Sequence, residues 1–132
     1  AACVGYLPLY VPYARPEEGI AELSSVIETH LPIAVLLLGM GADMHTASLF
    51  PGADRLIEAL APEAPVLLPM RAAGAAEARI TLSARTLDAA AYKHIVITGV
   101  EKRQALDAAH DLPVATAPVR AVLEGTTVHW AP

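Results

Sequence analysis

The stretch Ile33-Ala34-Val35-Leu36-Leu37-Leu38-Gly39-Met40-Gly41 decides how the chain can fold. It opens with a continuous apolar run that lies between Pro32 and Gly39. A short run bounded in this way is typical of a strand covered on both faces, as in a parallel sheet. The two glycines that follow permit a sharp turn and let a ligand approach the main chain. The stretch therefore indicates a buried strand that ends in a candidate ligand-binding loop.

Strand-like and helix-like segments alternate around this run. Residues 1–15 and 70–78 have no helical period and are predicted to be loops, and further strands are predicted at 65–69, 79–82, 94–98 and 126–130. Helices are predicted from Pro16 to a stop at Pro32, over 53–60, after the capping residue Ser83 through Ala91, from near Glu101-Lys102, and from Pro118 to Gly125. This alternation predicts an α/β layered fold with a mostly parallel sheet. Ligands bind beyond the carboxyl ends of such strands, which selects the loops after Leu38 and Thr98.

Length and composition narrow the class of protein. The chain has 132 residues, 55% of them apolar, which fits one ordinary domain or part of a larger one. No apolar run approaches the roughly 20 residues of a membrane span, and a net charge of −5 with no basic stripe argues against a nucleic-acid partner. The single Cys3 excludes an internal disulfide and fits a reducing compartment, so we expect a cytoplasmic protein. We interpret the start at Ala1, with no signal-peptide pattern, as an internal point of a longer chain.

The loop after Leu38 carries the most reactive side chains. His45 can take up a proton near neutral pH and is the candidate catalytic base. Asp43 could orient the imidazole or cap the segment that follows, which we expect to be helix-like and to offer free N–H groups to an anion. The alternative is that the glycines form an ordinary strand-to-helix connection and that His45 is structural.

Two arginines are candidates for anion binding. Arg79 lies where the 70–78 loop meets a strand, and Arg71 lies in the loop itself. The alternative for both is a solvated surface charge, and we expect Lys102 and Arg103 on a wet helix face. We expect no metal, because no His or Cys pair has the spacing of a local zinc site. A serine nucleophile is disfavoured, because no Gly-x-Ser-x-Gly elbow is present.

Residues 38–52 closely resemble the signature of the 6-phosphogluconolactonase family, Gly-x-Gly-x-Asp-Gly-His-Thr-Ala-Ser-Leu-Phe-Pro. The segments at 6–18, 79–90, 98–102 and 118–130 also resemble that family. The resemblance implies a three-layer, Rossmann-like α/β fold with flanking helices, shared with sugar-phosphate isomerases and deaminases. It implies hydrolysis of 6-phosphogluconolactone to 6-phosphogluconate in the pentose phosphate pathway, without metal or organic cofactor. It makes His45 and Asp43 catalytic, and the expected substrate-binding residues are Gly39, Gly41, Thr46, Arg71 and Arg79.

The chain also departs from the family's pattern. Met44 stands where the signature has glycine, and a lysine that often precedes the Arg-Ile-Thr-Leu strand is missing, so that Arg71 or another cation would replace it. A Gly-Gly-Ser-Thr phosphate loop and an Asp-Glu-Arg segment of the family's N-terminal half are absent. We therefore expect residues 1–132 to be the C-terminal part of a larger lactonase domain, inactive alone, with an incomplete sheet that pairs with the missing half or with itself.

In the hypothesised reaction, neutral His45 removes a proton from water and backbone N–H groups near Gly41 stabilise the oxyanion. Two other functions stay open. One is a sugar-phosphate isomerase or deaminase of the same fold, and the other is an inactive fragment that only binds sugar phosphates.

Overall fold

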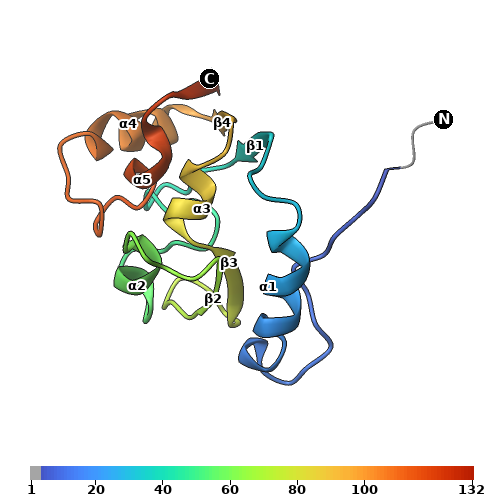
Figure 1. Cartoon of the computed structure of the whole chain (residues 1–132). Helices are drawn as coiled ribbons and strands as arrows, with labels where there is room; N and C mark the ends of the chain where they lie inside the picture. The colour runs from blue at the N-terminus through green and yellow to red at the C-terminus, as the bar shows by residue number, and fades with distance from the viewer. Residues whose placement is uncertain (1–3) are drawn as a thin grey trace.

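A computed structural model describes residues 4–132 (Figure 1). Residues 4–15 contain no helix or strand, as predicted; the first of them run away from the body of the molecule, whereas Val11 packs against the core cluster around Leu23. Cys3, on which the expected redox compartment depends, lies outside the described residues. Within residues 4–132, no helix is both long and apolar enough to cross a bilayer.

The elements follow the predicted alternation closely. The helices are the 3₁₀ turn η1 (Pro16–Glu18), α1 (Ile20–Glu28), α2 (Leu56–Leu60), α3 (Ala84–Asp88), α4 (Val100–Ala109) and α5 (Arg120–Leu123). The strands are β1 (Val35–Leu38), β2 (Leu67–Met70), β3 (Arg79–Leu82), β4 (Tyr92–Thr98) and β5 (Thr126–Ala131). The helix expected through Ala91 is shorter than predicted. The hydroxyl of Ser83, expected to cap it, lies 2.9 Å from the hydroxyl of Thr86 and makes no capping bond to the backbone.

The strands form one parallel sheet and one antiparallel pair. The parallel sheet has the order β1-β4-β5, while β2 and β3 pair antiparallel in a separate sheet. Strands β2 and β3 pair antiparallel because the loop 71–78 between them is short, whereas a parallel crossover needs about a dozen residues or more. The chain therefore has the predicted α/β class, with a parallel sheet flanked by helices.

The two faces of the parallel sheet differ in their covering. On one face Leu36, Ile95 and Ile97 are buried in the main core, together with residues of α3, α4 and α5. On the other face Val35 and Leu37 are 63% and 68% exposed. The prediction that residues 33–38 are covered on both faces is therefore wrong for this chain. One flanking layer of the expected three is absent from the described residues.

Candidate active site

The candidate site lies at the carboxyl end of β1. In the register of the parallel sheet Leu38 is opposite Ile95, so the loop after β1 and the start of α4 after β4 meet at the same edge. A cavity of about 450 Å³ opens there. Its lining residues are Leu37, Leu38, Gly39, Met40, Gly41, His45, Ala47 and Lys102. The rule that ligands bind beyond the carboxyl ends of strands therefore selected the two loops that meet in this cavity.

His45 and Asp43 form a hydrogen-bonded pair in this loop. Nδ1 of His45 lies 2.5 Å from Oδ1 of Asp43, and the backbone N–H of His45 donates to the same oxygen at 3.2 Å. The imidazole also lies against the buried ring of Phe50, with ring centroids 4.4 Å apart, and its side chain is 31% exposed. When Asp43 is ionised it accepts the Nδ1 proton, which leaves the Nε2 lone pair of His45 free to take a proton.

The charge on Asp43 is maintained by this pairing. Partial burial opposes the ionised carboxylate and by itself raises the pKa of Asp43. Hydrogen bonds from the His45 side chain and backbone outweigh that effect, so the pKa of Asp43 is below its ordinary value. Asp43 is therefore an anion at neutral pH and suited to orient the imidazole.

Position 41 needs a glycine because the His45 and Asp43 side chains lie where a Cβ atom would be. A Cβ atom at Gly41 would lie 2.3 Å from Nδ1 of His45 and 2.5 Å from Oδ1 of Asp43. The Gly41 amide donates to the His45 carbonyl at 3.0 Å, and the Met44 amide donates to the Gly41 carbonyl at 2.9 Å. Of the backbone N–H groups near Gly41 that were expected to stabilise an oxyanion, the one of Gly41 itself closes the loop instead.

The rest of the loop differs from the expected helix start. A turn and an isolated bridge between Thr46 and Leu49 follow Gly41, and α2 begins only at Leu56. The prediction of a helix N-terminus at this point is wrong. Its physical reason is that Met44 and Ala47 adopt φ values of 66° and 49°, which interrupt any helical run.

Met44 and Thr46 shape the loop. Met44 adopts the left-handed conformation that glycine favours, at the position where the signature has glycine. Thr46 is fully buried, and its hydroxyl donates to the carbonyl of Gly39 at 2.8 Å. This contact favours a positioning role for Thr46 over direct contact with a substrate.

The two arginines lie away from His45. Arg79 lines a separate pocket of about 830 Å³ together with Ser48. Ala47 lines the His45 cavity and Ser48 lines the Arg79 pocket, and the two pockets share no lining residue. Arg71 lines neither pocket, and its Nη1 lies 2.6 Å from Oε1 of Glu17 and 3.9 Å from Oδ2 of Asp54. This geometry favours a structural surface ion pair for Arg71, and it does not bring Arg79 into the His45 cavity.

Lys102 was missed in the sequence. It was expected on a wet helix face, yet it is half-buried and lines the His45 cavity from the first turn of α4. The sequence did contain a signal for this position, because Lys102 follows closely after the predicted strand 94–98 and Gly99. Among residues 4–132, no three His, Cys, Asp or Glu side chains gather as metal ligands.

Fold and site together define a class of protein: an α/β protein with a carboxylate-oriented histidine in a cavity at the carboxyl edge of a parallel sheet. The model of the family described as glucosamine-6-phosphate isomerases/6-phosphogluconolactonase matches residues 6–130. The chain belongs to this family.

Similar proteins agree with this assignment. The chain is 38% identical to the 6-phosphogluconolactonase of Mesorhizobium japonicum, covering 100% of this chain and 58% of that protein. It is 42% identical to the 6-phosphogluconolactonase of Pseudomonas aeruginosa, covering 100% of this chain and 57% of the relative. A crystal structure of a 6-phosphogluconolactonase from Shewanella baltica superposes with a TM-score of 0.87 at 28% identity, over 94% of this chain and 55% of that one. The chain thus spans somewhat more than half the length of these relatives.

Proposed function

We propose that this chain is the C-terminal, base-carrying part of a larger lactonase domain that hydrolyses 6-phosphogluconolactone to 6-phosphogluconate. The observation that carries the proposal is the 2.5 Å contact between Asp43 and His45 inside an open cavity. The relatives named above bear the name 6-phosphogluconolactonase, which supports this substrate. A substrate of central sugar metabolism favours a cytoplasmic location.

The reaction needs one group that both accepts and returns a proton. Asp43 holds the Nδ1–H of His45, so Nε2 accepts a proton from water as the water oxygen bonds to the lactone carbonyl carbon. The bond from that carbon to the ring oxygen then breaks, and the imidazolium donates its proton to the departing oxygen. The product is a carboxylic acid, which ionises and releases one proton to solvent. No other reactant is required.

Two cations suit a phosphorylated substrate. Lys102 lines the cavity beside His45, and in this proposal it replaces the missing family lysine as counter-charge. Arg79, which lines the second pocket, is a further cation whose guanidinium suits a phosphate. Gly39 and Gly41 shape the floor of the cavity, where a fixed substrate places its carbonyl near the imidazole.

The test is the substitution His45→Ala in the native polypeptide that contains this chain. Lactone hydrolysis is then measured in a pH-stat as the release of protons. We expect kcat to fall about 10²–10⁴-fold, because general-base catalysis contributes on that order. His110→Ala is the matched control, since His110 is exposed at the end of α4 and lines neither pocket. Near-normal turnover in a folded His45→Ala protein would remove His45 from the mechanism.

The family description also names glucosamine-6-phosphate isomerases. Isomerisation needs a carboxylate base next to the substrate, and the Asp43 carboxylate is committed to His45. Ammonia release from glucosamine 6-phosphate, measured beside lactone hydrolysis, separates the two activities. Release of ammonia without lactone hydrolysis would replace the lactonase proposal.

A further inference from the structure

Trp130, near the end of β5, holds the turn between β4 and α4. Its indole N–H donates to the carbonyl of Gly99 at 3.0 Å. The Gly99 amide in turn donates to the carbonyl of Ala131, the neighbour of Trp130, at 2.9 Å. Gly99 has a φ of 87°, which a residue with a side chain rarely adopts. Both polar groups of the Gly99 main chain therefore tie this turn to the last residues of β5.

The Gly99 carbonyl also starts α4. The Arg103 amide donates to it at 3.4 Å, as the first hydrogen bond of the helix. A carbonyl oxygen has two lone pairs, so it can accept from Arg103 and from the Trp130 indole together. The Arg103 guanidinium also lies over the Trp130 ring, 5.8 Å from the ring centroid, within the range of a cation–π contact. Trp130 thus holds the first turn of α4 at two points.

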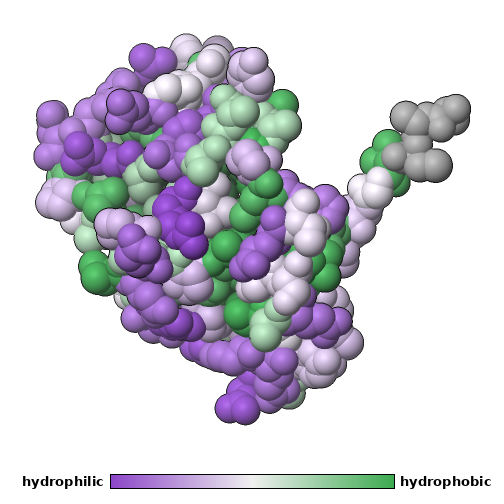
Figure 2. All heavy atoms as spheres, in the orientation of Figure 1, coloured by the Kyte–Doolittle hydropathy of each residue, from purple (hydrophilic) through white to green (hydrophobic). Residues whose placement is uncertain are grey.

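Within the part of the chain that the structure describes, core packing holds only the later turns of α4. The buried residues of this helix are Ala105, Leu106 and Ala109, and all of them lie beyond the first turn. Val100, the first residue of the helix, is 58% exposed. Figure 2 shows mainly purple, hydrophilic spheres where Figure 1 places α4. The position of the first turn therefore depends on its contacts with Trp130.

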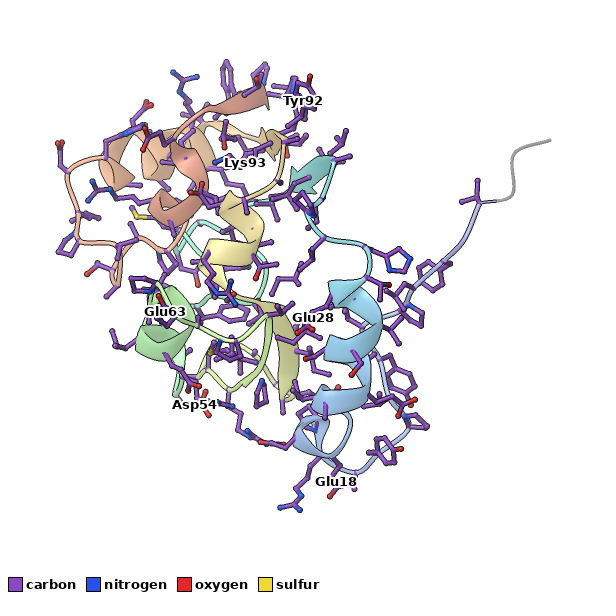
Figure 3. All side chains as sticks on the ribbon, viewed as in Figure 1. Glu18, Glu28, Asp54, Glu63, Tyr92 and Lys93 are labelled. Atoms are coloured by element: carbon purple, nitrogen blue, oxygen red, sulfur yellow. The ribbon has the colours of Figure 1, made fainter. Side chains whose placement is uncertain are left out.

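Strand β5 is a fixed support for these contacts. It pairs with β4 along its whole length. Just before β5 begins, the Lys93 ammonium donates to the carbonyl of Glu124 at 2.7 Å and forms an ion pair with Asp88. Figure 3 shows the labelled Lys93 pointing from β4 toward the helices. Trp130 therefore fixes the first turn of α4 relative to the sheet.

The first turn of α4 carries Lys102, which lines the His45 cavity. Lys102 stands between the two residues that contact Trp130, three positions after Gly99 and directly before Arg103. We propose that Trp130 is a positioning residue: it fixes the first turn of α4 and thereby keeps Lys102 in the cavity. This inference rests on the proposed function, in which Lys102 is the counter-charge of a phosphorylated substrate.

The test is Trp130→Phe in the native polypeptide that contains this chain. Phenylalanine keeps an aromatic face for Arg103 but has no N–H for the Gly99 carbonyl. We expect KM for 6-phosphogluconolactone to rise about two- to tenfold, the change that corresponds to one hydrogen bond. The value of kcat should stay within about twofold, because the His45–Asp43 pair is not touched. Amide hydrogen exchange at Arg103 should become faster, since its helical bond loses a support.

Thr126→Val is the matched control. The Thr126 hydroxyl donates to the carbonyl of Val122 at the other end of β5, so this variant also removes one hydrogen bond between a side chain of β5 and the backbone. It should lower the melting temperature as Trp130→Phe does, but it should leave KM unchanged.

A double-mutant cycle with Lys102→Met separates positioning from stability. Lys102→Met alone should raise KM about ten- to a hundredfold, because it removes a charged hydrogen-bond donor. If Trp130 acts through Lys102, adding Trp130→Phe to Lys102→Met raises KM no further.

An unchanged KM in Trp130→Phe, or an equal rise in Thr126→Val, would overturn the positioning role. A further rise of KM on the Lys102→Met background, or an unchanged KM in Lys102→Met itself, would overturn the action through Lys102. A folded native polypeptide that does not hydrolyse the lactone would remove the proposed function instead. Exchange at Arg103 then still decides whether Trp130 fixes the turn, since equal exchange with and without the indole would overturn that step.

Discussion

Replacing Gly41 with alanine tests the geometry of the loop more sharply than deleting His45 does. Gly41 is not in the left-handed region, so alanine fits its backbone without strain. The added methyl group meets the His45–Asp43 pair instead, because its carbon would lie 2.3 Å from Nδ1 of His45. The substitution therefore displaces the imidazole while leaving its chemistry present.

The size of the effect follows from the contact. Ordinary carbon contacts begin near 3.4 Å. The ring must therefore move by roughly 1 Å, a misplacement that can lower a rate by about 10²-fold. That factor corresponds to about 2.7 kcal/mol in the activation free energy. The free energy of unfolding should change by less than about 1 kcal/mol, because alanine also reduces the entropy of the unfolded chain.

The assay is kcat for lactone hydrolysis, measured with a thermal melt and the ¹⁵N spectrum of the His45 ring. Gly74→Ala is the matched control, since nothing lies within 4 Å of a Cβ at Gly74 and its backbone also accepts alanine. We expect lost activity and an altered His45 signal for Gly41→Ala alone. Full activity with an unchanged imidazole spectrum would refute the argument that Gly41 is required by the His45–Asp43 pair.

Three further outcomes are expected. Asp43→Asn should lower kcat by about 10²–10⁴-fold with the fold intact, because an amide no longer holds the His45 Nδ1 proton, and kinetics beside circular dichroism check it. Glu17→Gln should lower the melting temperature at pH 7 but not near pH 2: the hydrogen bond from Arg71 lowers the pKa of Glu17 to about 2, so the stabilisation exists above the ordinary value of 4.5 and disappears as the pH falls toward 2. Met44→Val should destabilise by about 1–2 kcal/mol in denaturant unfolding, because a β-branched residue resists its positive φ, whereas Met44→Gly should change stability by less than about 1 kcal/mol.

The order of helices and strands could be predicted from the sequence because it depends on local patterns of apolar residues, glycine and proline. The apolar runs of β1 and β4 and the glycine after each were sufficient to place the site at one edge of the sheet. The sequence left two roles open for Asp43, to orient the imidazole of His45 or to cap the segment that follows. The structure shows the first contact, because a side chain two positions away in a turn is within reach of the ring.

Other features depend on tertiary context. The short loop between β2 and β3 accounts for their antiparallel pairing, but their separation from the parallel sheet depends on packing that the local sequence does not specify. The prediction of a helix after Gly41 was wrong because Met44 and Ala47 adopt a left-handed backbone. Nothing in these two residue types signals that conformation. The role of Lys102 depends on the contact between two loops that are far apart in the sequence.

Among the described residues, the side chains that contact the His45 ring come from close neighbours in the chain. Its partners are Gly41, Asp43 and Phe50, and Thr46 ties the same segment back to Gly39. Such short closures cost little chain entropy. Distant residues hold the two sides of this segment, because the Val119 amide donates to the Met44 carbonyl at 3.1 Å and the Ser48 amide donates to the Thr81 hydroxyl at 3.3 Å. The His45–Asp43 pair itself is thus built within one contiguous segment of the chain. Loss of a neighbouring layer should then weaken substrate capture, seen in KM, before it disturbs the alignment of the imidazole.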